Sequence, residues 1–124
     1  MRVTSIADDI KLLMSPFMEK GFSYEYFYEK GGDSSCVYIC RFRKGRDYFD
    51  WRETSGEEEV HLVAYVRDEY YFPSIKTLFP KEYKIFALKH LLKRATFQEK
   101  RVFTADLLKK ELLSGKADFL KIPL

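Results

Sequence analysis

Tyrosine and arginine stand at alternate positions in two segments of this chain, a spacing that suits recognition rather than bond-making chemistry. The residues concerned are Tyr24, Tyr26 and Tyr28 in segment 22–29, and Arg41 and Arg43 in segment 36–43. Residues two apart on a β-strand lie on the same face of the sheet. Tyrosine mixed with arginine on such a face suits the stacking of nucleic-acid bases or the energetic centre of a protein interface.

The register of the first hairpin decides whether these residues share a face. A four-residue loop at 31–34 pairs residue 26 with residue 39 and residue 24 with residue 41. In that register the three tyrosines lie beside Arg41, Arg43, Tyr48 and Arg52. Val37 and Ile39 would lie on the same face, so the alternative is that a helix covers it and the tyrosines belong to the core.

The last part of the chain offers a second binding chemistry, because its charge is opposite to that of the first part. Residues 73–124 hold 12 Lys and Arg against 5 Asp and Glu, a net +7, whereas residues 1–72 hold 10 against 14, a net −4. A basic helical surface attracts nucleic-acid phosphates. An isoelectric point of 8.8 and a net charge of +3 favour an ordinary solvated surface instead. The basic residues considered are Lys81, Lys84, Lys93, Arg94, Lys100 and Arg101.

Catalytic and metal-binding patterns are weak in this sequence. His61 and His90 fall in different predicted elements, and neither stands at zinc-ligand spacing from the cysteines. No glycine-rich phosphate loop precedes a helix. The carboxylates at 47, 50, 53 and 57–59 are interpreted as paired or solvated. We therefore predict no metal site, no cofactor and no enzymatic activity.

Cys36 and Cys40 are predicted to remain free thiols. On one strand they lie about 13 Å apart at ~3.3 Å per residue, beyond the ~7 Å limit for Cα atoms joined by a disulfide. Two unpaired cysteines fit a reducing compartment. No apolar leader opens the chain, and no segment approaches the ~20 apolar residues of a membrane span, so we predict a cytoplasmic protein with no membrane contact.

The elements that must position these residues follow from periodicity. With 124 residues, 46% hydrophobic and 33% charged, the chain is predicted to form one domain, residues 1–124. Apolar residues recur at helical spacing over 5–20, with a break at Pro16 and an end at Gly21. The pattern then predicts antiparallel strands at 22–29, 36–43, 48–54 and 60–67, with a short fifth strand at 70–72.

The remainder is predicted to be helical. Ser74 caps a short turn that runs to residue 79, and Pro80 begins a helix that ends at Lys93. Thr96 and Glu99 form a capping box that opens a last helix at 97–114, with Gly115 as its end signal. The apolar segment 119–124 is expected to contact the body of the domain.

The second hairpin has a register that can be derived from its turn. A two-residue loop at Gly45 and Arg46 pairs residue 40 with Trp51 and residue 41 with Asp50. Trp51 is therefore predicted to be buried under the helices. Arg41 and Asp50 are predicted to form an ion pair across the opposite face.

Together these patterns predict an α+β fold: an N-terminal helix, a four- to five-stranded antiparallel meander, and two to three C-terminal helices packed on one sheet face. We interpret the chain as a small non-enzymatic protein-binding domain, of a type that includes toxin-neutralising partners. A nucleic-acid-binding domain that uses the basic helices is the alternative. The sequence predicts no particular oligomeric state.

Overall fold

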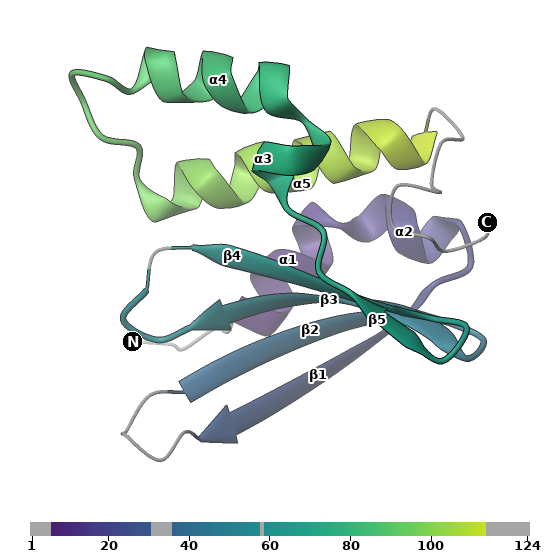
Figure 1. The fold of residues 1–124 in the computed structure, drawn as a ribbon. Helices are drawn as coiled ribbons and strands as arrows, with labels where there is room; N and C mark the ends of the chain where they lie inside the picture. The colour runs from purple at the N-terminus through teal and green to yellow at the C-terminus, as the bar shows by residue number, and fades with distance from the viewer. Residues whose placement is uncertain (1–5, 31–35, 58, 114–124) are drawn as a thin grey trace.

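A computed structural model describes residues 6–30, 36–57 and 59–113 of the chain, and these residues form an α+β fold (Figure 1). The elements follow in the predicted order of helix, sheet and helices. They are α1 (Ile6–Leu13), α2 (Ser15–Glu19), β1 (Ser23–Lys30), β2 (Cys36–Lys44), β3 (Asp47–Thr54), β4 (Val60–Val66), β5 (Glu69–Tyr71), α3 (Ile75–Leu78), α4 (Pro80–Lys89) and α5 (Phe97–Leu113).

The sheet is a five-stranded antiparallel meander in which each strand pairs with its neighbour in the sequence. All five predicted strands are present, with ends that differ from the prediction by at most one residue. The second hairpin has the predicted register, with Arg41 opposite Asp50 and Cys40 opposite Trp51. Gly45 adopts a φ of +67°, the left-handed conformation that a two-residue turn requires.

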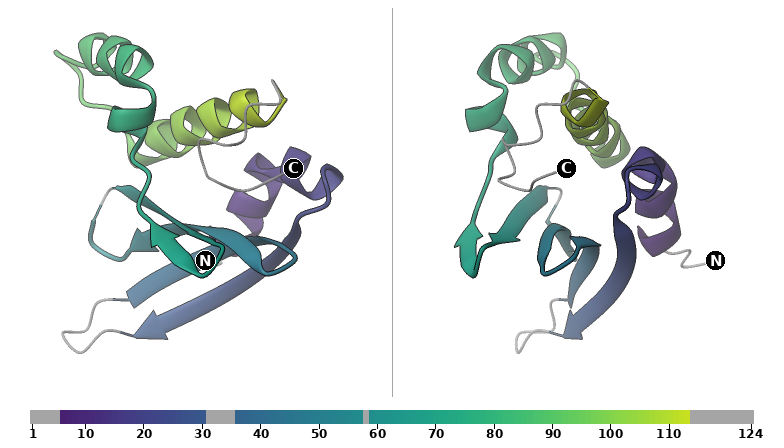
Figure 2. Two further views of the ribbon diagram at one scale, coloured as in Figure 1. Left: turned by 45° about the vertical axis from the view of Figure 1, so that its right-hand side comes forward. Right: turned by 90° about the vertical axis from the view of Figure 1, so that its right-hand side faces the viewer.

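The helices all lie on one side of the sheet (Figures 1 and 2). Residues of α1, α2 and α5 form one hydrophobic cluster with one face of the strands. Trp51 is fully buried in this cluster, as predicted, and Phe42 and Phe49 stack beside it with ring centroids 5.0 Å apart. We call this side the helix-bearing face and the opposite side of the sheet the helix-free face.

The N-terminal helix is broken where the sequence predicted. Pro16 lies in the first turn of α2, where its missing N–H removes no intrahelical hydrogen bond. The backbone N–H groups of Gly21 and Phe22 donate to the carbonyl groups of Met18 and Phe17. Gly21 has a φ of +97°, which turns the chain from α2 into β1.

The capping box at the start of α5 is confirmed by both of its hydrogen bonds. The Thr96 N–H donates to Glu99 Oε1 over 2.8 Å, and the Glu99 N–H donates to Thr96 Oγ1 over 3.1 Å. These bonds satisfy two donors that the first turn would otherwise leave without partners. Gly115 and segment 119–124, for which the sequence made predictions, lie outside the described residues.

The segment formed by α3 and α4 contacts the rest of the fold less extensively. None of the residues of α3 or α4 is buried. Phe86 stacks on Phe103 of α5 at a centroid distance of 4.1 Å, whereas Ile85 and Leu88 are exposed. Helix α4 ends at Lys89 rather than at the predicted Lys93, because His90 and Leu91 form turn-like hydrogen bonds to Ala87 and Leu88.

Candidate functional site

The first hairpin pairs in a different register from the predicted one. Lys30 pairs with Cys36, so five residues separate the two strands instead of the four that we expected. Tyr26 therefore pairs with Cys40 rather than with residue 39. A shift of one residue moves every side chain of a strand to the other face. The prediction that the tyrosines share a face with the arginines is wrong for Tyr24, Tyr26 and Tyr28.

The three tyrosines lie on the helix-bearing face, and each makes a different contact. The Tyr24 hydroxyl donates to the Ala7 carbonyl oxygen over 2.7 Å, and burial raises the pKa of Tyr24. Tyr26 lines a pocket of about 410 Å³ that reaches α5. The Tyr28 hydroxyl lies 2.9 Å from Cys36 Sγ. Tyr24 thus supports the packing of α1, as the alternative interpretation anticipated for the tyrosines.

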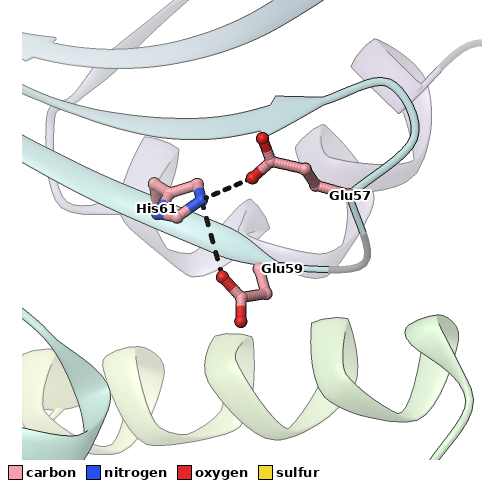
Figure 3. Close-up of side chains that lie close together, drawn as sticks. All are labelled: Glu57, Glu59 and His61. Carbon is pink, nitrogen blue, oxygen red and sulfur yellow. Dashed lines mark ion pairs between the residues drawn. The ribbon is translucent and has the colours of Figure 1, made fainter.

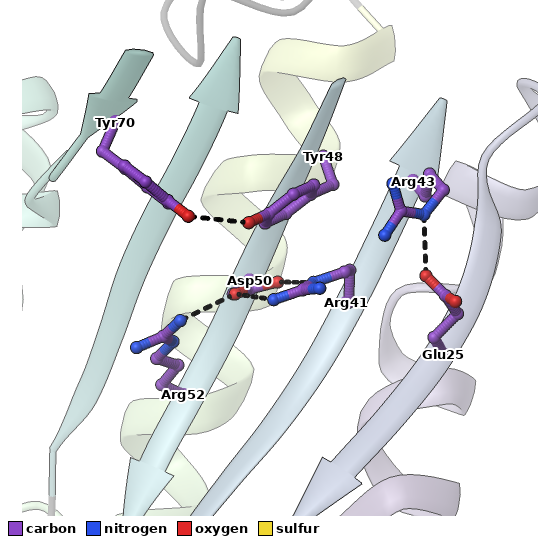
Figure 4. Close-up of polar contacts among 7 residues, drawn as sticks. All are labelled: Glu25, Arg41, Arg43, Tyr48, Asp50, Arg52 and Tyr70. Atoms are coloured by element: carbon purple, nitrogen blue, oxygen red, sulfur yellow. Dashed lines mark hydrogen bonds and ion pairs between the residues drawn. The ribbon is translucent and has the colours of Figure 1, made fainter. Parts of the chain in front are cut away.

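The predicted arginines do lie together, on the helix-free face, with Tyr48 among them (Figure 4). Arg41 forms two hydrogen bonds with Asp50, of 2.8 and 3.0 Å, through Nε and Nη2. Arg52 Nη2 adds a third bond to the same carboxylate over 3.1 Å. Asp50 is 0% exposed although none of the described helices covers this side. A buried carboxylate is tolerable here because both of its oxygens are bound by cationic donors.

Aromatic rings fix Arg41 from two sides. Its guanidinium carbon lies 3.8 Å from the ring centroid of Tyr48 and 4.8 Å from that of Phe27. Arg41 is charged at physiological pH like any arginine, and the hydrogen bonds to Asp50 raise its pKa further. Burial raises the pKa of Tyr48 to about 12, and its hydroxyl lies 3.4 Å from that of Tyr70. The centre of the face is therefore a charged aromatic cluster with defined geometry.

The rim of this cluster remains open to solvent. Tyr70 is 57% exposed, Phe27 is also exposed, and Arg43 pairs with Glu25 through a 2.8 Å contact between partly exposed groups. Within the described chain, Arg52 Nε has no hydrogen-bond partner although it is buried. We define the helix-free cluster as Glu25, Phe27, Arg41, Arg43, Tyr48, Asp50, Arg52 and Tyr70.

The helix-bearing face contains a second arginine–carboxylate pair, which the sequence did not predict. Glu53 is only 2% exposed. Its carboxylate accepts hydrogen bonds from Arg101 Nε over 2.8 Å and Nη2 over 2.6 Å, and from Trp51 Nε1 over 2.9 Å. The pair joins β3 to α5 across the core. The capping box that begins α5 at Thr96 was the signal for the helix, but no local signal indicated its partner.

The predicted basic surface is only partly retained. Arg101 is engaged with Glu53 and is therefore not available as a member of that surface. Lys81 and Lys84 are exposed on α4, and Lys93 and Arg94 are exposed in the turn that follows it. Lys100 lies on α5 and is half-buried. The exposed remainder belongs to α4 and its following turn, so these residues do not form a stripe along α5.

Two glutamates and a histidine meet beside the start of β4 (Figure 3). His61 Nε2 lies 3.5 Å from Glu57 Oε1 and 3.9 Å from Glu59 Oε2. Their potential ligand atoms lie within 4.8 Å of one another, but all three residues are exposed. The contacts of His61 with the two glutamates join exposed side chains, and no buried polar group adds a further ligand among the residues described. This geometry needs no metal ion to explain it.

The two cysteines are free, as the strand spacing predicted, and they differ in environment. Cys40 is buried on the helix-bearing face, and burial raises its pKa to about 11. A thiol with such a pKa is almost entirely protonated at neutral pH and is a poor nucleophile. Cys36 is partly exposed and is held by the Tyr28 hydroxyl.

Comparisons with known proteins give no family for this chain. No family model, curated protein or solved structure matches it. Among the described helices, none is both long enough and apolar enough to cross a membrane. Function must therefore be argued from the geometry of the surfaces.

Proposed function

We propose that this chain is a small non-enzymatic protein-binding domain whose interface is the helix-free cluster. The observation that carries the proposal is the fixed position of Arg41, bound to Asp50 through two hydrogen bonds and stacked on Tyr48. Arginine and tyrosine are enriched among residues that dominate binding energy. A side chain that is already ordered loses little entropy when a partner binds.

The arrangement of the cluster resembles that of a protein interface, with a desolvated centre and a polar rim. Asp50 and Tyr48 form the buried centre, and the more exposed Arg43 and Tyr70 lie around it. Such a rim excludes water from the contacts at the centre. The cluster also lies on strands rather than loops, which keeps its geometry rigid.

The test compares two tyrosines of nearly equal exposure on opposite faces. Tyr70 is 57% exposed on the helix-free face, and Tyr28 is 54% exposed on the helix-bearing face. A partner is identified by co-purification with the native protein, and its affinity for each variant is then measured by titration. We expect Tyr70→Ala together with Arg43→Ala to weaken binding by about tenfold or more, which corresponds to 1.4 kcal/mol. We expect no change for Tyr28→Ala.

Unchanged affinity in the Tyr70 and Arg43 double variant, with the fold retained, would contradict the proposal. A thermal melt followed by circular dichroism checks the fold. Equal losses for Tyr28→Ala and Tyr70→Ala would place the interface elsewhere or indicate indirect effects of folding.

The alternative proposal, a nucleic-acid-binding domain, makes a different quantitative prediction. Phosphate contacts by the basic residues of α4 would make affinity fall with salt, with a log–log slope that grows by about 0.7–0.9 per phosphate neutralised. Fluorescence titration with single- and double-stranded oligonucleotides at low salt measures this slope. Absence of binding below roughly 100 μM, the range of non-specific binders, eliminates the alternative.

A further inference from the structure

Strand β4 extends beyond its partner on one side. Its residues 64–66 pair with β5, whereas Val60, His61, Leu62 and Val63 pair with β3 alone. The strand therefore has a free edge four residues long, within the described part of the sheet. This edge lies on the same side as α3 and α4, which follow β5 in the chain (Figure 1).

The direction of the backbone groups along this edge follows from the adjacent hairpin. Val66 and Glu69 close a two-residue turn in which Arg67 and Asp68 both have positive φ angles, of 52° and 66°. In such a turn the closing residues form a hydrogen-bonded pair, and pairs alternate along an antiparallel ladder. Counting back by twos from Val66, the N–H and C=O groups of Leu62 and Val60 are directed away from β3.

These four backbone groups are suited to pairing with another strand. The backbone hydrogen bonds between described segments include none from Val60 or Leu62 on that side. An unpaired strand edge is a template for an added strand, with main-chain hydrogen bonds that supply affinity for any extended peptide. Side-chain pockets beside the edge then decide which peptide binds.

The free edge opens into a groove of about 650 Å³. Phe86 and Ala87 of α4 form part of the wall opposite β4, and Phe103 of α5 and Ile75 of α3 contribute further apolar surface. A volume of this size is typical of ligand-binding sites. It accommodates the apolar side chains that an added strand would present toward the helices.

The charges beside the groove are predominantly basic. Lys76, Arg94 and Lys100 line it, together with His90, and Glu59 is the acidic residue on the strand side. Neither Lys76 nor Arg94 forms an ion pair with another described residue; Lys76 Nζ lies 5.9 Å from the centroid of the Tyr83 ring. Charge complementarity therefore favours a peptide with acidic side chains.

We propose that this groove binds an extended acidic–apolar segment of a partner protein as an additional strand on β4. Apolar side chains at the centre of the segment contact Phe86 and Phe103, and acidic residues that flank them face Lys76 and Arg94. The site is separate from the helix-free cluster, because it is formed by the strand edge and helices on the other side of the molecule. It does not depend on the function proposed above.

The test uses as its probe a fluorescent peptide with a central run of Val flanked by Glu residues (the Glu/Val peptide), and the full chain as the receptor. Val60→Pro removes the outward N–H at the first residue of β4, a position at which proline costs no bond to β3. Val60→Ala keeps the N–H and is the matched control. We expect at least a tenfold weaker affinity for Val60→Pro than for Val60→Ala, measured by fluorescence anisotropy.

The charge requirement is tested with a second matched pair. Lys76→Glu together with Arg94→Glu is expected to weaken binding of the Glu/Val peptide at least tenfold and to favour the corresponding Lys/Val peptide. Lys81→Glu places the same charge on an exposed position of α4 outside the groove and is expected to have little effect. Circular dichroism verifies that each variant is folded.

Several results would overturn the proposal. They are failure of the full chain to bind the Glu/Val peptide at millimolar concentration, equal affinities for the Glu/Val and Lys/Val peptides, and equal affinities of folded Val60→Pro and Val60→Ala. A dimer that Val60→Pro converts to monomer, and that the peptide does not disrupt, would identify a second copy of the chain as the occupant instead. Loss of partner binding in the Tyr70 and Arg43 double variant has no bearing on this groove.

Discussion

Asp50 and Glu53 lie three residues apart on β3, and both bind an arginine through two hydrogen bonds, yet they hold different parts of the molecule together. Asp50 binds Arg41 of the neighbouring strand on the helix-free face. Glu53 binds Arg101, which is 48 positions away in sequence and belongs to α5. The first pair lies within the sheet, and the second joins the sheet to a helix.

The comparison shows how position in the fold decides the role of the same chemical pair. The Arg41 pair adds to a hairpin that its turn and strand register already define. The Arg101 pair joins the sheet to α5 beside Trp51, and its carboxylate is only 2% exposed. We expect removal of the arginine to weaken the fold more in the second case than in the first.

The largest effect is expected for Arg101→Leu. This change leaves the Glu53 carboxylate buried without its cationic partner, so the free energy of unfolding should fall by about 3–5 kcal/mol. Urea denaturation followed by Trp51 fluorescence measures it. The double variant Glu53→Leu and Arg101→Leu should lose less than Arg101→Leu alone, because it removes the stranded charge. A larger loss in the double variant would show that Glu53 stabilises the fold even without Arg101, through its hydrogen bond from Trp51.

Arg41→Leu should have an intermediate effect. Asp50 keeps its hydrogen bond from Arg52, so we expect a loss of about 1.5–3 kcal/mol, typical of a hydrogen bond to a charged group. The same urea titration applies, and the protein should remain folded at neutral pH. A loss equal to that of Arg101→Leu would contradict the distinction between the two pairs.

Thr96→Ala tests the capping box at the start of α5. Loss of the Thr96 side-chain acceptor should reduce the unfolding free energy by ~1 kcal/mol. Hydrogen bonds from the Thr96 backbone, from His90 and from the Thr96 side chain lower the pKa of Glu99, and Thr96→Ala removes the last of these. The stabilisation that Glu99 provides is lost as pH falls through its folded pKa. The difference in unfolding free energy between Thr96→Ala and the parent protein should therefore be smaller in mild acid than at neutral pH. Denaturation under both conditions measures it. Equal differences at both pH values would refute this coupling.

The smallest expected effect is a change in the pH dependence of stability, and it concerns Cys40. Its folded pKa of about 11 lies above its ordinary value of 9.0, so the folded state retains the thiol proton longer than the unfolded state. This contribution is complete below pH 9 and is lost as pH rises through the folded pKa. Unfolding free energies measured in alkaline solution should fall less steeply for Cys40→Ala than for the parent protein. Identical slopes would show that other groups, such as Tyr24, account for the alkaline decline.

The sequence predicted the second hairpin better than the first, and the reason is the length of the turn. Gly45 and Arg46 match a two-residue connection, and that connection fixes the pairing of Arg41 with Asp50. Segment 31–35 permits connections of four or five residues, and the choice between them inverts β1. The arginine part of the candidate site was therefore predicted from local chemistry, and the tyrosine part was not.

Contacts between distant elements could not be predicted in the same way. The capping box of Thr96 and Glu99 is local, so its residue types and spacing were sufficient. The contact of Glu53 with Arg101 depends on how α5 crosses the sheet, which no spacing within one element specifies. The groove beside β4 likewise exists because β5 has only three residues, and a strand's length is less certain than its presence.

The slight burial of α4 has a consequence for the cooperativity of unfolding. A helix without buried residues, held mainly by Phe86 on Phe103, contributes few contacts that global unfolding must break. Such a segment opens in sub-global fluctuations while the sheet and α5 stay native. Amide hydrogens of α4 should exchange with solvent orders of magnitude faster than those of β3. The molecule then combines a slowly exchanging sheet with a helix that samples open states, at the boundary of the groove beside β4.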